Sequence, residues 1–208
     1  MIMRGILNIM SKLILCVETT TNICSVGLFK DSTSLVLKEN YDKSHSSVLA
    51  LFVEQIFQET KFNINELDAI AISVGPGSYT GLRIGISFVK GIAYSLNIPI
   101  IPIDTIDSLN TKITELNYLI AIHAYSDNYY LQEFKDKVKY GAPKFVSIDE
   151  IDKNKNIYGY NSKKEKFIEI IKPSAKKIAK LAFENYNKSI VKDIKLVKPN
   201  YINPIKFK

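Results

Sequence analysis

The sequence has no tryptophan and only two cysteines, two histidines and two arginines among 208 residues. Cys16 and Cys24 are too few for a disulfide framework, and their spacing matches no metal motif. They lie in consecutive apolar segments, where they either face each other across a hairpin or remain separate, and we expect free buried thiols in a reducing compartment. No apolar run approaches the roughly 18 residues of a membrane-spanning helix. The composition therefore excludes a disulfide-rich secreted domain and an integral membrane protein.

The first 12 residues need a separate interpretation. Arg4 followed by apolar residues is faintly similar to a secretory signal. However, Ser11 and Lys12 interrupt the apolar stretch, and Leu15 is bulky where a cleavage site needs a small residue. We therefore interpret residues 1–12 as an N-terminal extension or an early start codon, and we expect a cytoplasmic protein with no membrane partner.

The scarcity of arginine also limits what the positive charge can mean. The net charge is +7, and residues 135–208 hold 19 lysines against 8 acidic residues. A basic half is compatible with nucleic-acid binding. Arginine, however, is the preferred residue for bidentate contacts with phosphates and bases, and only Arg4 and Arg83 are present. A solvated lysine surface is the favoured interpretation, and direct contact with RNA remains the alternative.

Hydrophobic patterns predict a well-defined first half and a less readable second half. In the first half we expect strands over residues 13–17, 23–29, 34–39, 68–74 and 98–103, and helices over 45–59 and 80–96. In the second half we expect a hairpin over 118–125 and 129–134, a helix from 173 to about 187, and an extended tail over 197–205. Residues 135–162 show no clear pattern.

The most informative segment, GPGSYTGLRIG at 75–85, lies between a predicted buried strand and a predicted helix. Phosphate-binding loops occur at such places. The spacing of its glycines nevertheless fits neither a Walker loop nor a dinucleotide fingerprint, and the residues around Ser78 do not form a nucleophile elbow.

Two of its glycines lie within the predicted helix, where each costs up to about 1 kcal/mol relative to alanine. Gly81 and Gly85 are four residues apart and therefore share one helix face. Close approach of another backbone explains them, and that backbone is either the chain's own sheet, the helix over 45–59, or a partner chain.

The segment SVGPGSYTGLRIG at 73–85 resembles the signature of the TsaB family. The opening segments ILCVETT (14–20) and CSVGL (24–28) are similar to the first hairpin of that family. The pair His45–Ser46 before a long apolar helix, and the tail KPNYI (198–202), are also similar. The resemblance is strong over 13–109 and weak over 110–208.

The resemblance implies an α/β fold of the actin/Hsp70/sugar-kinase (ASKHA) type, with two similar subdomains of which the second is reduced. We accordingly expect an extension over 1–12, a first subdomain over 13–109 that carries partner-binding helices, and a smaller lysine-rich subdomain over 110–208.

The resemblance also implies a role in attaching threonylcarbamoyl to the adenosine beside the anticodon of tRNA (t6A). The family pairs with the catalytic relative TsaD, and the ATPase TsaE acts in the same pathway. The implied role is therefore a non-catalytic subunit that forms a dimer with TsaD or with itself and meets tRNA through the complex. It has no cofactor of its own, and ATP or ADP at the interface with TsaD remains open.

The two helices that the resemblance assigns to pairing supply the expected partner-binding residues: His45, Leu49, Phe52, Val53, Ile56, Thr80, Gly81, Arg83, Ile84, Gly85 and Phe88. For Arg83 we weigh a partner contact against a salt bridge. A nucleotide-binding role is considered for Glu18, Thr19 and Thr20, where the family often has aspartate in place of Glu18. Many members also have Asp-Ala-Arg-Arg where this chain has His-Ala-Tyr-Ser at 123–126.

No catalytic or metal-binding residue is expected. The two histidines are 78 residues apart, and no cluster of histidines and acids has metal-ligand spacing. We expect His45 to form a hydrogen bond at a helix start and His123 to be a core residue. The alternative function is a self-sufficient ATPase or kinase of the same fold, and a peptidase is disfavoured because no nucleophile and base are paired.

Overall fold

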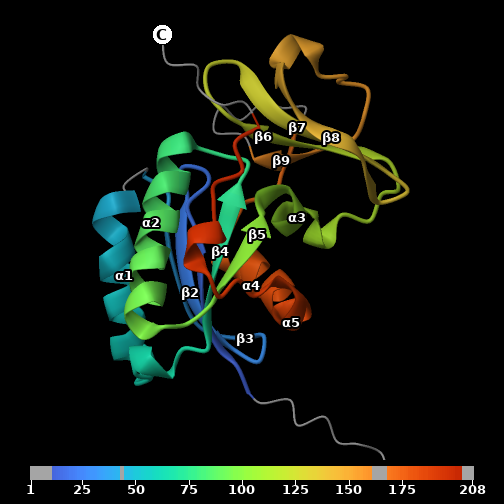
Figure 1. Ribbon diagram of the computed structural model, residues 1–208. Helices are drawn as coiled ribbons and strands as arrows, with labels where there is room; N and C mark the ends of the chain where they lie inside the picture. Colours follow the sequence, from blue (N-terminus) through green and yellow to red (C-terminus); the bar gives the residue numbers. More distant parts are fainter. Residues whose placement is uncertain (1–10, 43–44, 161–167, 203–208) are drawn as a thin grey trace, which may run out of the picture.

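The computed structural model describes residues 11–42, 45–160 and 168–202, which form two five-stranded mixed sheets (Figure 1). The first sheet has the order β3-β2-β1-β4-β5. Its elements in chain order are β1 (Leu13–Glu18), β2 (Cys24–Lys30), β3 (Thr33–Asn40), α1 (His45–Thr60), β4 (Ala69–Gly75), α2 (Tyr79–Leu96) and β5 (Ile100–Asp104). The three opening strands pair antiparallel, whereas β4 and β5 add on in parallel through helical crossovers.

The second sheet repeats this arrangement. Its strands are β6 (Tyr118–His123), β7 (Asn128–Lys135), β8 (Val138–Ser147), β9 (Ile157–Tyr160) and β10 (Glu169–Ile170), and their order is β10-β9-β6-β7-β8. Here too an antiparallel meander of three strands is followed by two parallel additions. The expectation of two similar subdomains with a reduced second one is confirmed, because β10 has only two residues and the crossover after β8 contains only the 3-10 turn Ile148–Glu150.

The first sheet is buried on both faces. Leu13, Leu15 and Val17 of β1 pack in a core with α1 and α2, and the alternate residues Ile14 and Cys16 pack in a second core. This alternation follows from the two-residue period of a strand. Because both faces are covered, every residue of β1 is buried, as its continuous apolar run predicts.

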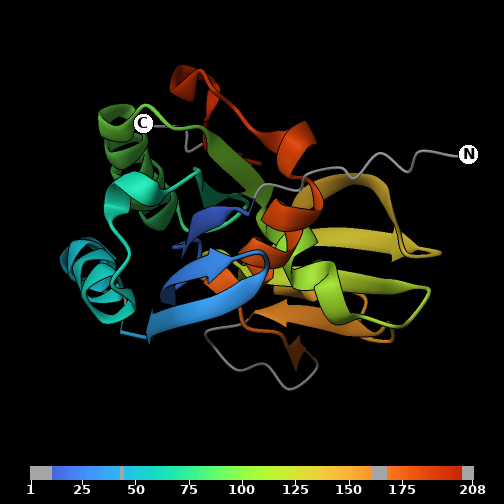
Figure 2. The ribbon, with the colours of Figure 1, turned by 90° about the horizontal axis from the view of Figure 1, so that it is seen from below.

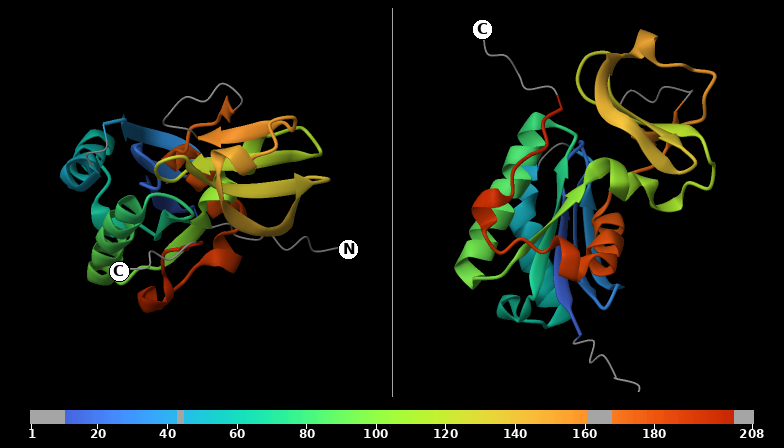
Figure 3. Two further views of the ribbon diagram at one scale, coloured as in Figure 1. Left: turned by 90° about the horizontal axis from the view of Figure 1, so that it is seen from above. Right: turned by 45° about the vertical axis from the view of Figure 1, so that its right-hand side comes forward.

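The helix on the second face comes from the far end of the chain. Ala175, Ile178, Ala179 and Ala182 of α4 (Ala175–Glu184) form the second core with the alternate residues of β1. Figure 3 shows the second sheet beyond one end of the first layer, while α4 and α5 (Tyr186–Ser189) have returned to the first layer. The helices α4 and α5 therefore pack with the first sheet, although the predicted division at residue 110 grouped them with the second.

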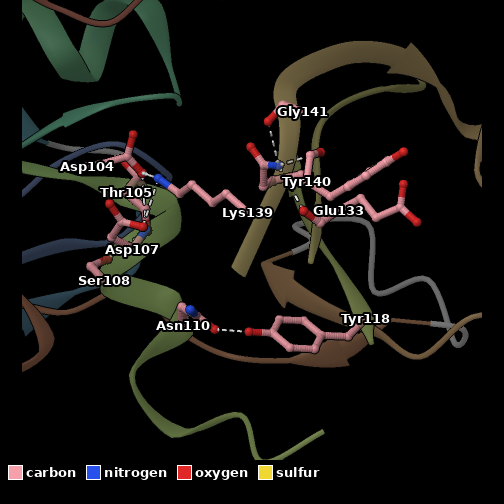
Figure 4. A network of polar contacts seen from close by, with 11 residues as sticks. Asp104, Thr105, Asp107, Ser108, Asn110, Tyr118, Glu133, Lys139, Tyr140 and Gly141 are labelled. Carbon is pink, nitrogen blue, oxygen red and sulfur yellow. Dashed lines mark hydrogen bonds and ion pairs between the residues drawn. The ribbon is translucent and has the colours of Figure 1, made fainter. Parts of the chain in front are cut away.

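A polar joint connects the two layers where β5 ends (Figure 4). Asp104 caps the short helix α3 (Thr105–Leu109) by accepting a hydrogen bond from the amide of Asp107 at 3.1 Å. Lys139 of β8 reaches across to Asp107 at 2.8 Å and to Asp104 at 3.6 Å. Nearby, the hydroxyl of Tyr118 donates to the side chain of Asn110. The second sheet is thus held to the first by side chains from α3 and the turn that follows it.

The structure confirms the predicted elements of the first half to within two residues at their ends. It adds β8, β9, β10 and α3, which the sequence pattern did not indicate, and it starts α4 at Ala175 after Ser174 in place of Pro173. Cys16 and Cys24 are free and buried, as expected. The interpretation of residues 1–12 concerns a segment of which 1–10 lie outside the described residues.

Candidate functional site

A cleft of about 600 Å³ lies between the two layers, where the turns of both sheets meet the helix starts. The turn after β1 contributes Thr20, Thr21 and Asn22, and the starts of α1 and α2 contribute polar side chains. The opposite wall comes from the β6–β7 turn and from Tyr160 at the end of β9. The remaining lining residues are His45, Ser46, Ser78, Thr80, Ile84, His123, Ala124, Tyr125 and Ser126.

Two helices of 16 and 18 residues begin at this cleft. The side chain of Ser78 caps α2 by accepting a hydrogen bond from the amide of Gly81 at 3.2 Å. A helix start carries a partial positive charge and unpaired amide groups, which together favour an anion. The cleft can therefore accommodate a small anionic group, and no carboxylate lines it among the residues that the structure describes.

His45 has a defined role at the start of α1. It is only 6% exposed, and its Nε2 lies 2.7 Å from the carbonyl oxygen of Thr21. Because that oxygen can only accept, Nε2 donates the hydrogen bond. Burial lowers the pKa of His45, so the ring is neutral and its Nδ1 is a buried acceptor with no partner among the described residues. The expected helix-start hydrogen bond is thus confirmed, and it ties α1 to the β1–β2 turn.

His123 differs from its prediction. We expected a core residue, but His123 is half-buried and lies on the wall of the cleft, where its Nε2 is 2.9 Å from the carbonyl oxygen of Ser126. The cleft begins where β6 ends, so the apolar pattern of that strand does not extend to its last residue.

Glu18, which was considered for nucleotide binding, does not line the cleft. Its side chain is fully buried, and Oε1 accepts hydrogen bonds from the amide and the hydroxyl of Thr20 at 2.5 Å each. Oε2 has no hydrogen-bond partner among the described residues. Burial raises the pKa of Glu18, and the Thr20 hydrogen bonds offset this only in part. Thr19 is also buried and does not line the cleft. Of the three residues considered for nucleotide binding, only Thr20 lines it.

The glycines of α2 make room for the chain's own turn. A Cβ atom at residue 81 would overlap the carbonyl oxygen of Thr19, and one at residue 85 would overlap its hydroxyl. That hydroxyl donates to the carbonyl oxygen of Gly81 at 2.9 Å. Of the three explanations, close approach within the chain itself is therefore correct, and the contacting backbone is the turn that follows β1 of its first sheet. Gly81 and Gly85 are buried there and are not available to a partner.

The other predicted partner-binding residues divide into a buried and a surface group. His45, Leu49 and Ile56 of α1 are buried within the chain, so their predicted direct contact with a partner is corrected. Val53 is also mostly buried, but it lines a groove at the surface of α1 and α2. Thr80 and Arg83 are exposed, and Phe52, Ile84 and Phe88 are half-buried. The apolar stripe that the sequence pattern indicates in α1 is thus the face that packs on the core. The surface of α1 that another molecule can reach lies next to that face.

A shallow apolar groove of about 510 Å³ runs over the outer surface of α1 and α2. These helices lie side by side on one face of the first sheet (Figure 1). The groove is lined by Ala50, Val53, Glu54, Phe57, Gln58, Ile64 and Phe88. We define these seven residues as the helix groove. Leu51 and Tyr94 add apolar side chains that are 46% and 80% exposed on the same two helices.

The model of the family TsaD, tRNA N6-adenosine threonylcarbamoyltransferase, matches residues 36–202 of this chain. A tRNA threonylcarbamoyladenosine biosynthesis protein TsaB from Buchnera aphidicola subsp. Schizaphis graminum is 28% identical over 86% of this chain and 97% of its own length. Its counterpart from Buchnera aphidicola subsp. Acyrthosiphon pisum is 30% identical over 60% of this chain and 58% of its own.

The chain belongs to this family, on its TsaB branch. A solved structure, YeaZ from Pseudomonas aeruginosa, superposes with a TM-score of 0.72 at 20% identity over 91% of this chain and 99% of that one. The fold is accordingly of the actin/Hsp70/sugar-kinase type. The matched segments span 58% and 61% of the length of two curated TsaB relatives and nearly all of the third.

Arg83, within the TsaB signature, contacts two tyrosines of its own chain, and its predicted contact with a partner stays a prediction. Its guanidinium carbon lies 3.9 Å from the centre of the Tyr79 ring, and the side chain donates to the hydroxyls of Tyr79 and Tyr201. Tyr201 stacks on Tyr79 with ring centres 4.7 Å apart. No ion pair involves Arg83 within the described ranges, so its predicted salt bridge is wrong there. Arg83 instead holds Tyr201 of the tail against α2. The tail is also attached to β4, because the amide of Asn200 donates to the carbonyl oxygen of Val74 at 2.7 Å.

Sequence reasoning did not assign Ala50, Phe57 and Ile64 of the helix groove to partner binding. Phe57 belongs to the apolar stripe of α1, and this was the available signal. Ile64 lies in the 3-10 turn after α1, which shows no helical period. Among the residues that the structure describes, no group of three or more histidine, cysteine or acidic side chains is placed to hold a metal ion. Nor does any helix in those ranges have the length and apolar character needed to cross a membrane.

Proposed function

We propose that this chain is a non-catalytic subunit of the machinery that transfers threonylcarbamoyl to tRNA, and that it acts by docking the helix groove onto TsaD. The observation that carries this proposal is an apolar groove on two long helices, in a chain whose Glu18 is fully buried. Apolar surface of this kind on paired helices is typical of protein interfaces.

TsaD is the favoured partner because this chain resembles both proteins. Its curated relatives include TsaB proteins and also a tRNA N6-adenosine threonylcarbamoyltransferase from Fusobacterium nucleatum, which is 29% identical over 44% of this chain. Two related folds that present equivalent helices can pair face to face. The TsaB homodimer is the corresponding self-pairing through the same groove. TsaE and tRNA would then join through the complex.

The interlayer cleft is the place for any nucleotide that the complex holds on this chain. Two helix starts open into it, and Thr20 is the one residue of the predicted nucleotide set that lines it. ATP or ADP at the contact with TsaD is therefore proposed to approach the starts of α1 and α2, and not Glu18.

The alternative function, a self-sufficient ATPase or kinase, loses its main support. That hypothesis relied on Glu18, whose carboxylate is fully buried and bonded to Thr20. It would be revived if the purified chain hydrolysed ATP and if Glu18→Gln, which keeps the shape of the side chain, abolished the turnover.

The docking proposal is tested by placing a charge in the helix groove. Ala50 is exposed and lines the groove, so Ala50→Arg should leave the core intact and bring an unpaired charge into the interface. We expect the variant to bind TsaD at least about tenfold more weakly, because an uncompensated interfacial charge costs several kcal/mol. The measurement is size-exclusion chromatography with TsaD, followed by calorimetric titration.

Ala142→Arg is the matched control, since Ala142 is exposed on β8 of the second sheet. It should bind TsaD with unchanged affinity. A native chain that stays separate from TsaD, or an Ala50→Arg variant that binds as tightly as the native chain, would refute the proposal. Chromatography of each chain alone reports on self-pairing through the same groove.

A further inference from the structure

A second cavity, of about 630 Å³, lies on the opposite side of the first sheet from the helix groove. It opens between α4, the β2–β3 hairpin and the segment after α3, which lie next to one another in Figure 2. Four lysines and one acidic residue line it: Lys112, Lys176, Lys177, Lys180 and Glu184. We refer to it as the lysine cavity. Its other lining residues are Phe29, Ser32, Ser34, Thr111 and Ser174.

The positive charge of the lysine cavity is largely uncompensated. Lys177 donates to the carbonyl oxygen of Lys172 at 2.8 Å, and Lys180 donates to that of Thr111 at 3.2 Å. A carbonyl group satisfies a hydrogen bond but does not neutralise a charge. Within the described ranges, all five ion pairs lie elsewhere and none uses a lysine of this cavity.

The positive charges of neighbouring lysines in this cavity repel one another. Burial and the neighbouring Lys112 lower the pKa of Lys177 to about 8, while the buried Glu18 behind it opposes this shift. An anion bound among these groups would relieve the repulsion and favour the charged form. The three serine hydroxyls of the lining would supply further donors to its oxygen atoms.

We propose that the lysine cavity binds the phosphate backbone of RNA, and that the tRNA of the proposed complex is its occupant. The identity of the RNA rests on the proposed function. Lysine is a flexible point charge, which suits backbone phosphates that carry no sequence information. Lys176 and Lys180 are one helical turn apart on α4, and Lys112 faces them from a separate segment, so the charges span more than one phosphate.

The position of the lysine cavity is compatible with docking. The helix groove covers one face of the first sheet, whereas α4 covers the other. A chain that holds TsaD through α1 and α2 therefore keeps the lysine cavity free for RNA. The excess of 19 lysines over 8 acidic residues in 135–208 provides attraction at longer range.

The test measures binding of a labelled, unmodified tRNA transcript to the full chain by fluorescence anisotropy over a series of salt concentrations. The variant Lys176→Gln/Lys177→Gln/Lys180→Gln should weaken binding at least about tenfold, and the slope of log K against log salt should fall by about 2 to 3. Replacing the same three residues by arginine should preserve both values. Because Lys177 is half-buried, the pair Lys112→Gln/Lys180→Gln, both exposed, provides a second test with a slope loss of about 2.

The matched control removes three exposed lysines outside the cavity, as Lys188→Gln/Lys192→Gln/Lys195→Gln. It should change affinity less than about twofold. Equal losses in control and test variants, unchanged binding in both test variants, or no RNA binding by the native chain would overturn the proposal. So would competition by polyglutamate or inorganic phosphate as effective as that by tRNA. Co-elution with TsaD is scored separately, so a failure of docking is distinguishable from a failure of RNA binding.

Discussion

The two sheets share one strand order, but they differ in what connects their strands. In the first sheet, helices of 16 and 18 residues link β3 to β4 and β4 to β5. In the second sheet, a 3-10 turn of three residues lies between β8 and β9, and β10 starts soon after β9 ends. Among the described residues, the long helices that carry the proposed docking surface therefore occur only in the first half. The shorter half contributes one wall of the cleft and the joint around Lys139.

The largest expected effect comes from the contact that fixes α2 in the first half. Gly81→Leu should destabilise the chain by about 3 kcal/mol, the upper part of the usual range for overpacking, because the backbone of Thr19 has no room to move. Urea unfolding followed by circular dichroism measures this change.

Gly91→Leu is its control in the same helix, because nothing lies within 4 Å of a Cβ atom there. It should be neutral or stabilising by up to about 1 kcal/mol, since glycine is a poor helix former. Equal stability of the two variants would show that the turn does not set the position of α2.

A smaller effect, of opposite sign, is expected at Glu18. Glu18→Gln retains an acceptor for Thr20 and removes a buried charge, so we expect a gain of about 1 kcal/mol at neutral pH. Burial raises the pKa of Glu18 in the folded state. The free energy of unfolding of the native chain therefore falls as the pH rises above the pKa that Glu18 has in the unfolded chain. The stability difference between variant and native chain should thus vanish in acid and grow as pH rises through the ordinary range of a glutamate and above it.

Thermal unfolding of both proteins across this pH series measures the difference. Glu54→Gln, on the exposed surface of α1, should show no such trend. A Glu18→Gln variant that is less stable than the native chain at neutral pH would mean that the carboxylate is required where it lies.

The smallest effect is expected at the joint between the halves. Lys139→Met removes the ion pairs with Asp104 and Asp107, whose side chains are 25% and 46% exposed. Partly exposed pairs contribute about 0.5 kcal/mol, so global stability should change little. Hydrogen exchange in α3 and β8 should nevertheless become faster, while exchange in β1 and β4 stays constant. If exchange in α3 and β8 were equally fast in the variant and in the native chain, other contacts would hold the second sheet in place.

How much the sequence predicts also differs between the halves. Continuous apolar runs revealed β1 and β4 because both strands are buried on both faces. β8 was missed because it is an edge strand that pairs only with β7, so it is mostly exposed and tolerates Gly141 and Pro143. α3, with five residues, is too short to show a helical period.

The site was less predictable than the fold for a related reason. A helical stripe such as Leu49, Val53 and Ile56 identifies the face that packs on the sheet, and the partner-accessible face is what remains. The closeness of Thr19 to Gly81 and Gly85 depends on how the turn after β1 packs against a distant helix. Such contacts between segments about 60 residues apart leave no periodic signal.

The return of α4 to the first sheet has a consequence for synthesis on the ribosome. Ile14, Cys16, Ala69 and Ala71 form one side of a core that Ala175, Ile178 and Ala182 complete. As the nascent chain emerges, the apolar side of its first sheet stays exposed to solvent until residue 182 has left the ribosome. Chaperones that bind apolar surface therefore have their longest opportunity on this half, and a stop codon between β10 and α4 would release a product prone to aggregate.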